Sequence, residues 1–445
     1  MSTAVSSVRS LAHLEPPSDG PHPDWLAPVR REALEWVAQH GFPAAKDEDW
    51  RYTPLRVLLE APLEAARPDT SGGSVLAPLA RVADLGGAQL VFVNGFYAPF
   101  LSRPGRRSEG IAVTNMAAAL AAGDGRLRAA LERPLPAYRH AFHALNTALA
   151  TDGAFIHLAP GAVLDEPVHL VFISESGDAP VLVSPRSIVI GEAGSQVTVV
   201  ETYLGTPGST GCTNARTDVE LQVGARVEHY KVQDEPVSVT HLASLGVRQG
   251  ADSSFRSHSV TLGAGLARDE VSVRLEAERA QVDLGGLYLP GDGQCHDNPV
   301  LIEHVAPGGT SRQLFKGVVD GDGHGIFNGH IIVGSGAFRT DARQTNRNLL
   351  LSDRAEVDTR PRLEIFADDV QCAHGATVGQ LDEDALFYLR SRGIPRPVAR
   401  ALLIEAFAGE IVSRIVPAQL AALVQRLVAD RLCAGVPERS RERTP

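Results

Sequence analysis

A cysteine and a histidine stand one residue apart late in the chain, in Cys372-Ala373-His374. In a β-strand, side chains two positions apart lie on the same face, with about 6.5 to 7 Å between their Cα atoms. Such a pair suits joint ligation of one soft or borderline metal. Structural zinc and iron–sulfur clusters normally take four ligands, so other coils or another chain would have to complete the site. The alternative is a buried cysteine beside a hydrogen-bonded histidine.

Two other motifs could also be read as metal sites. Cys295-His296-Asp297 has no partner motif, and Asp320-Gly321-Asp322-Gly323-His324 lacks the terminal glutamate of an EF-hand loop. Because Asp-Gly pairs are typical of tight β turns, we predict turns at both places. The sequence has no G-x-x-x-x-G-K-[S/T], G-x-S-x-G or H-E-x-x-H motif, so nucleotide hydrolysis, serine-hydrolase and zincin chemistry lack their signatures.

Composition limits the class of protein. The chain has 445 residues, 44% of them hydrophobic and 21% charged, with a formal net charge of -11. It is long enough for two or three structural units. The acidic balance, with no local basic patch evident in the sequence, argues against nucleic acid or a membrane surface as a partner. The N-terminus has no apolar signal region and no long apolar run follows, so we expect a cytoplasmic protein with free thiols.

The elements that position these residues fall into three predicted domains and a tail. Residues 1–150 should be a mainly helical N-terminal domain, with a helix over 24–41 that Asp24 caps and Gly41 ends. Within it, residues 90–100 predict a strand, an Asn-Gly turn and a second strand. Residues 151–377 should form the β core, residues 378–436 a C-terminal helical domain, and residues 437–445 a frayed tail.

The β core carries a repeat. Short β-branched runs follow turns that we align at Gly194, Gly224, Gly250, Arg279, Gly308, Gly336 and Arg354, giving steps of 30, 26, 29, 29, 28 and 18 residues. A repeat of strands without helices predicts stacked coils. We therefore expect a mainly β protein with a right-handed parallel β-helix core, in preference to a β-sandwich, which has no reason to show the longer period.

The helical tail should begin with a helix capped by Asp382 and stopped by Gly393. A second helix, over residues 396–415, places apolar residues on one face at steps of 3 and 4. A third helix should follow Pro417.

Three segments have a distinctive sequence: FHALNTALATDGAFIHLAPGAVLDEPVHLVF (142–172), HVAPGGTSRQLFKGVVDGDGHGIFNGHIIV (304–333) and the block from Gln344 to Val412. They resemble the SufB/SufD family of the SUF iron–sulfur cluster assembly system. KDEDWRYTPL (46–55) and HGATVGQLDEDALFYLRSRGI, next to Cys372, resemble the SufD branch. The segment NRNLLLSDRAEVDTRP lacks the further cysteines found in SufB-type proteins, which argues against a sole cluster scaffold.

The resemblance implies a non-enzymatic subunit of a SufB-SufC2-SufD complex. A SufB-like protein would pair with the last β coils, where His374 and Cys372 are candidate metal ligands for a transient cluster shared with SufB. A SufC-like ABC-type ATPase, which binds the ATP, would contact the C-terminal helix through Leu403, Phe407 and Ile411. Ordinary packing of this helix on the solenoid is the alternative. FAD could dock on the assembled complex, and the chain alone could form a homodimer.

The end of a β-helix gives an independent reason to expect a partner. Its last coil presents unpaired N–H and C=O groups that template further strands. A partner's coil would satisfy them, and the alternative is a cap formed by the chain's own C-terminal helices.

Two other functions remain open at this point. A carbohydrate-active β-helix enzyme of the pectate-lyase kind would use Asp341, Arg343, Asp368 and Asp369 along one groove, although such enzymes are typically secreted. A homodimeric structural β-helix without a metal role is the other.

Overall fold

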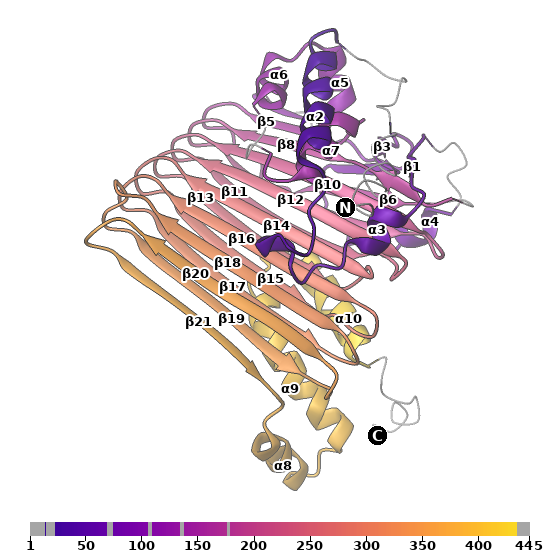
Figure 1. Cartoon of the computed structure of the whole chain (residues 1–445), viewed down its shortest axis with the longest axis vertical. Coiled ribbons are helices and arrows are strands. Elements are labelled where there is room, and N and C mark those ends of the chain that lie inside the picture. The colour runs from indigo at the N-terminus through magenta and orange to yellow at the C-terminus, as the bar shows by residue number, and fades with distance from the viewer. Residues whose placement is uncertain are drawn as a thin grey trace.

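A computed structural model describes residue 14 and residues 23–68, 74–105, 109–133, 138–175 and 179–433. The chain is mainly β, with a parallel β-solenoid of about seven turns and helices at both ends of the chain (Figure 1). The predicted fold class is therefore confirmed, and the β-sandwich is excluded. The tail predicted at residues 437–445 lies outside the described residues.

Each coil contributes one strand to each of two sheets, so that even-numbered and odd-numbered strands separate along most of the solenoid. Sheet A contains β4 (Ile111–Asn115), β5 (Ala154–Leu158), β8 (Arg186–Gly191), β10 (Gly211–Leu221), β12 (Val239–Gln249), β14 (Leu266–Leu275), β16 (Cys295–His304), β18 (His324–Val333) and β20 (Glu356–Ile365), with β7 (Val181–Val183) and β1 (Glu64–Ala65) at its side. Sheet B contains β3 (Phe96–Tyr97), β2 (Gln89–Val93), β6 (Val168–Ser174), β9 (Gln196–Gly205), β11 (Arg226–Asp234), β13 (Ser254–Thr261), β15 (Gln281–Tyr288), β17 (Thr310–Val319), β19 (Asp341–Leu350) and β21 (Gln371–Gly379).

The register of the strands explains the repeat in the sequence. From β8 and β9 onward, paired residues in successive coils lie between 26 residues apart, from β12 to β14, and 32 residues apart, from β18 to β20. Gly194 and Gly224 occupy equivalent turns from sheet A to sheet B with φ of 69° and 66°, a conformation that glycine adopts without steric cost. Arg354, however, lies in a turn from sheet B to sheet A, between β19 and β20. Its alignment with the other turns was wrong, which accounts for the short step of 18.

Most of the interior of the solenoid is apolar, because inward-facing residues from the two sheets form one continuous core. Val199, Val219, Val247, Val273, Ile302 and Ile331 are representative members, each almost fully buried. Stacked β-branched side chains of this kind suit the pleated surface of parallel strands.

Most of the helices lie in the N-terminal region. They are α2 (Leu26–His40), α3 (Arg56–Glu60), α4 (Leu76–Leu79), α5 (Met116–Ala121), α6 (Gly125–Glu132) and α7 (Ala141–Leu149), with a 3-10 turn η1 (Glu48–Trp50). The α2 helix ends before Gly41 as predicted, but its N-cap residue is Trp25, so the predicted cap by Asp24 is wrong. The strand–turn–strand prediction is confirmed by β2 and β3, which pair on either side of Asn94 and Gly95.

Helix α7 lies across the outer face of sheet A and is tied to it by buried amides. Asn146 Nδ2 donates hydrogen bonds to the carbonyl oxygens of Pro185 and Asn214, at 3.0 and 2.7 Å. Asn214 Nδ2 in turn donates to the carbonyl oxygen of Phe142. These bonds fix α7 against the strands below it.

The C-terminal helices are α8 (Glu383–Ser391), α9 (Arg396–Val412) and α10 (Ala418–Cys433). Asp382 caps α8 as predicted, accepting from the backbone N–H groups of Asp384 and Ala385. Helix α9 packs on the flank of sheet B over β15 and β17, where Lys316 Nζ donates to the carbonyl oxygen of Phe407. The helices therefore cover a side of the solenoid.

Candidate functional site

The last coil, formed by β20 and β21, leaves the end of the solenoid open. Strand β20 pairs with β18 and β21 pairs with β19, and no other strand in the described part of the chain pairs with their outer edges. Most residues of β21 are exposed. The helices α9 and α10 lie along sheet B (Figure 1). The described residues thus contradict the alternative in which the chain's own helices cap this edge.

His374 and Cys372 both lie on β21, at this open end. In the parallel register Cys372 pairs with Ala342 and His374 pairs with Gln344. Ala342 and Gln344 are buried, and Gln344 Nε2 donates to Gln313 Oε1 one coil further in. The pair therefore continues two columns of inward-facing side chains. Because no coil follows, His374 is exposed and Cys372 is half-buried.

The two candidate ligands differ in how readily they could bind a metal. Cys372 packs against the edge of the apolar core, and this burial raises the pKa of its thiol. A metal would have to displace the thiol proton, whereas the imidazole of His374 is exposed at the open end. Within the described residues, the one group of three potential metal ligands lies elsewhere, so the pair is not a complete site in this chain.

The residues expected to contact an ATPase fall into two sets. Leu403 and Phe407 are half-buried, but Ile411 is fully buried in the cluster that holds α9 on sheet B. Ile411 therefore anchors the helix, and its predicted role as a contact residue does not fit this conformation. The apolar side chains that α8 and α9 do expose are Phe387, Tyr388, Val398 and Leu402.

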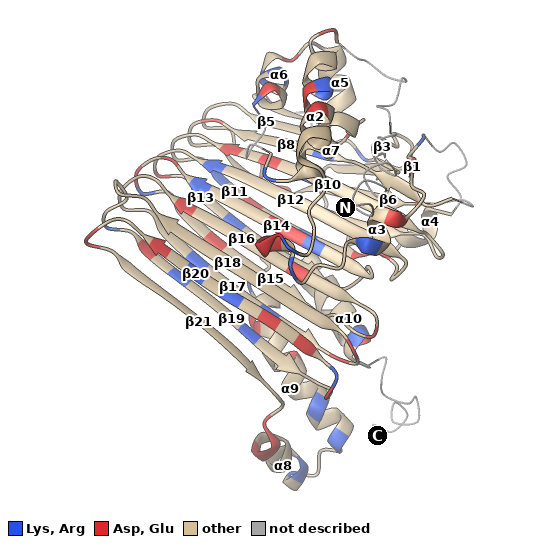
Figure 2. Ribbon diagram, in the orientation of Figure 1, with Lys and Arg blue, Asp and Glu red and all other residues tan. Residues whose placement is uncertain are grey.

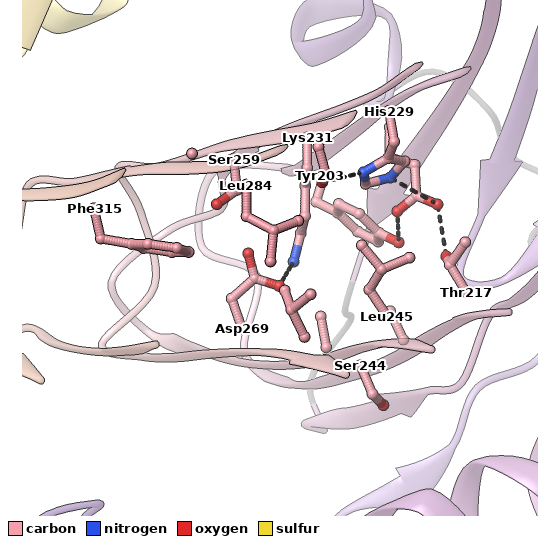
Figure 3. Close-up of a pocket in the computed structure, with 16 residues that line it drawn as sticks. Tyr203, Thr217, His229, Lys231, Ser244, Leu245, Ser259, Asp269, Leu284 and Phe315 are labelled. Carbon is pink, nitrogen blue, oxygen red and sulfur yellow. Dashed lines mark hydrogen bonds and ion pairs between the residues drawn. The ribbon is translucent and has the colours of Figure 1, made fainter. Parts of the chain in front are cut away.

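A small polar cavity lies inside the solenoid, between the two sheets (Figure 3). Glu201 accepts hydrogen bonds from Thr217 and Tyr203, and Lys231 Nζ lies 2.8 Å from Asp269 Oδ1. These buried charges are paired, as burial requires. The cavity measures about 20 Å³, which is room for one water molecule, so we assign it a structural role.

A basic groove of about 700 Å³ lies between sheet B and α9. Five arginines line it, together with two acidic residues. They are Arg256, Arg312, Arg343, Arg347 and Arg414, with Asp283 and Glu410. The sequence analysis found no basic patch, and that expectation was wrong, because strand register brings together arginines from separate coils. Elsewhere, basic and acidic residues are interspersed along the visible strands (Figure 2).

The two other motifs have different outcomes. Asp320-Gly321-Asp322-Gly323 forms the predicted turn, with Gly321 at φ 60°. Cys295-His296-Asp297, in contrast, begins strand β16 and is buried, so the turn predicted there is wrong. His296 Nε2 lies 2.9 Å from the carbonyl oxygen of Gly263, which gives it a structural partner.

The residues of the polysaccharide-lyase alternative are engaged in ion pairs and a turn. Asp341 is bonded to Arg312 and also lies 3.6 Å from Arg343 Nε. Asp368 and Asp369 lie in the turn between β20 and β21.

Comparison with known proteins decides between the candidate functions that the sequence left open. The model of the SUF system FeS cluster assembly SufBD core domain matches residues 172–407, and that of the SufBD protein N-terminal region matches residues 21–170. The chain belongs to the SufBD family. A SufBD family protein of Synechocystis is 33% identical over 421 residues, 91% of each chain. The iron–sulfur cluster assembly protein SufD of Escherichia coli is 31% identical over 414 residues, 92% of this chain and 94% of that one.

Bacillus subtilis SufD is 29% identical over 295 residues, 65% of this chain and 67% of that one. The SufBD family takes part in iron–sulfur cluster assembly, so this is the process in which the chain is placed. None of the helices in the described ranges is long and apolar enough to cross a membrane.

Proposed function

We propose that this chain is a non-catalytic, SufD-like subunit that acts with a SufB-like protein and a SufC-like ATPase in iron–sulfur cluster assembly. The observation that carries the proposal is the open last coil with the exposed His374 on it. Names of relatives support the SufD assignment.

The partner at the open end would be the SufB-like protein. Unpaired backbone groups along β20 and β21 favour the addition of matching strands, which would extend both sheets across the interface. The exposed apolar residues Ile365, Phe366 and Val378 near this edge would become buried at the same time.

His374 would then face the partner's side chains and, with Cys372, contribute to a transient site for iron and sulfide. The structure supports His374 as the more available ligand, because it is exposed while burial raises the pKa of the Cys372 thiol. Cluster ions here are cargo, shared with the SufB-like protein.

The ATPase would dock on the C-terminal helices. The exposed apolar residues of α8 and α9, with the half-buried Leu403 and Phe407 beside them, form the surface that supports this contact. ATP-driven closure of two ATPase subunits would reach the seam through α9, since α9 is anchored on the same sheet that ends in β21. The predicted flavin on the assembled complex stays a prediction.

Co-expression with a SufB-like and a SufC-like protein, followed by size-exclusion chromatography, tests the proposal. We expect one peak that contains all three chains. A peak of this chain alone, or of its homodimer in the presence of both partners, would contradict it.

A substitution separates assembly of the complex from the metal role. His374→Ala should leave the three-chain peak intact and lower the iron and sulfide content of the complex. His40→Ala, which removes an exposed histidine from α2, is the matched control. Unchanged iron and sulfide in His374→Ala would refute the metal role.

A further inference from the structure

Two histidines and a glutamate meet where α7 crosses sheet A, away from the open end of the solenoid. His140 is the N-cap residue of α7, His143 lies in its first turn, and Glu270 lies on β14. His140 Nε2 is 3.0 Å from Glu270 Oε2, and His143 Nε2 is 3.4 Å from Glu270 Oε1. One ligand atom from each residue lies within 4.8 Å of the others.

These separations suit one metal ion. Two ligand atoms that each lie about 2.1 Å from an ion are about 3.0 Å apart at an octahedral edge and about 3.4 Å apart at a tetrahedral edge. The two His–Glu distances lie at those values, one to each carboxylate oxygen, while the three ligand atoms together span up to 4.8 Å, so the side chains would draw closer around a bound ion.

The two histidines are also in the protonation state that a metal ligand needs. Burial lowers the pKa of His143 to about 3 and lowers the pKa of His140 below its ordinary value. Both imidazoles are therefore neutral near pH 7, and neutral imidazole is the form that binds metals.

The cluster contains polar atoms without hydrogen bonds. Within the described chain, His143 Nδ1 has no hydrogen-bond partner, and His143 Nε2 and Glu270 Oε1 face each other at 3.4 Å outside hydrogen-bond geometry. His143 is 1% exposed, and buried polar atoms are normally satisfied. A bound cation would satisfy the lone pairs of His143 Nε2 and Glu270 Oε1 together.

An ion could reach this place from solvent. His140 and Glu270 line a surface pocket of about 410 Å³, together with Trp50 and Arg268. The Arg268 guanidinium lies 3.5 Å from Glu270 Oε2, but it is also hydrogen-bonded to Asp297, whose negative charge offsets it. Arg139 and Arg362 also line this pocket, together with Asp47, Glu48 and Asp49, so its entrance carries charges of both signs and Glu270 is the carboxylate beside the two imidazoles.

The pairing of the strand beneath the cluster is also interrupted there. The pairing of β14 with β16 omits Asp269 and Glu270, which lie opposite Asn298 and Pro299. Proline cannot donate to the ladder, and local breaks in pairing often re-aim a side chain next to a site.

We propose that His140, His143 and Glu270 bind one divalent transition-metal ion. Two imidazole nitrogens and one carboxylate are the ligand set of mononuclear Fe(II) sites with open positions, and Zn(II) accepts the same donors. The proposal goes beyond the proposed function and does not depend on His374 or on any partner.

Metal binding to the full chain tests it, in a Cys372→Ala, His374→Ala background that removes the candidate ligands at the open end. The probes are Co²⁺, followed by its visible absorption, Zn²⁺ in equilibrium dialysis, and Fe²⁺ without oxygen, which separates the two natural candidates. We expect one equivalent of metal in the parent. Loss of one ligand in His143→Ala or Glu270→Gln should weaken binding by at least about 100-fold, because mutation of an outer-shell partner alone costs about 10–100-fold.

The controls address folding. His304→Ala removes a histidine that is buried as deeply as His143 but is bonded to Ser311, and it should bind metal as the parent does. Glu270→Gln keeps the shape of the side chain but removes its negative charge. Zn²⁺ should therefore raise the unfolding temperature of the parent and not that of this variant. Parent-like binding by His143→Ala and Glu270→Gln, or no binding by the parent at about 1 mM metal, would overturn the proposal.

Discussion

The exposed residues of the C-terminal helices give a quantitative test of the proposed ATPase contact. Phe387 on α8 is 71% exposed and Leu402 on α9 is 44% exposed. Full burial of such a side chain contributes about 1.5–3 kcal/mol. Scaled by the exposed fraction, Leu402→Ala should cost about 1 kcal/mol of binding free energy and Phe387→Ala about 1.6 kcal/mol. These values correspond to about 5-fold and about 15-fold weaker binding.

The folding stability of the same variants separates contact from support. Phe387→Ala and Leu402→Ala remove exposed side chains and should change the free energy of unfolding by less than about 0.5 kcal/mol. Ile411→Ala removes a buried anchor and should lower it by about 2–5 kcal/mol.

The assay is isothermal titration calorimetry of each full-length variant with the SufC-like ATPase, beside urea unfolding of the variant alone. Phe100→Ala, which truncates a fully exposed phenylalanine in the N-terminal region, is the matched control and should bind normally. The reasoning is refuted if Phe387→Ala and Leu402→Ala bind as tightly as the parent, or if Ile411→Ala is as stable as they are.

Two further predictions follow from burial. Burial lowers the pKa of seven imidazoles in the described part of the chain below the ordinary value of about 6.5, and it lowers five of them to about 3 or 4. The unfolded chain therefore binds more protons, and stability that is present above about pH 6.5 is lost as the pH falls. The folded-state values are about 3 for His143, His258 and His296 and about 4 for His169 and His304. At pH 5.5 each of these five histidines lowers the free energy of unfolding by about 1.4 kcal/mol, or about 7 kcal/mol together, which is comparable with the stability of a whole domain. Circular dichroism should therefore show unfolding near pH 5. A fully folded chain at pH 4 would contradict this. Of the three cysteines with described side chains, Cys372 should react first with iodoacetamide, because Cys212 and Cys295 are more deeply buried. It should react more slowly than a free thiol, and faster as the pH rises, because burial raises the pKa of its thiol. Equal labelling of all three cysteines in the folded chain, read by mass spectrometry, would refute this order.

The features that sequence reasoning found are those encoded locally. The Asn94-Gly95 turn needs two residues with positive φ, and the cap of α8 needs the Asp382 side chain. The solenoid was predictable because equivalent turns recur at nearly constant spacing. The same local reasoning failed for the predicted cap of α2 by Asp24, because the N-cap residue is Trp25, whose side chain makes no capping hydrogen bond.

The features that it missed depend on register and on long-range packing. His140 and Glu270 are 130 residues apart, and only the crossing of α7 over β14 brings them together. The basic groove likewise requires the stacking of Arg312 on Arg343 in adjacent coils. Cys295 was assigned to a turn because Asp-Gly pairs are typical of tight β turns, yet Cys295, His296 and Asp297 begin β16 and are buried.

Hydrogen exchange of β21 tests the central claim most directly. Amides of residues 372–378 would be compared by mass spectrometry in the chain alone and in its complex with the SufB-like protein, with the β15 amides as an internal reference that is already paired on both sides. The account predicts fast exchange at the outward-facing amides of β21 in the free chain and strong protection in the complex. Unchanged exchange along β21 in a complex that forms through another surface would contradict it.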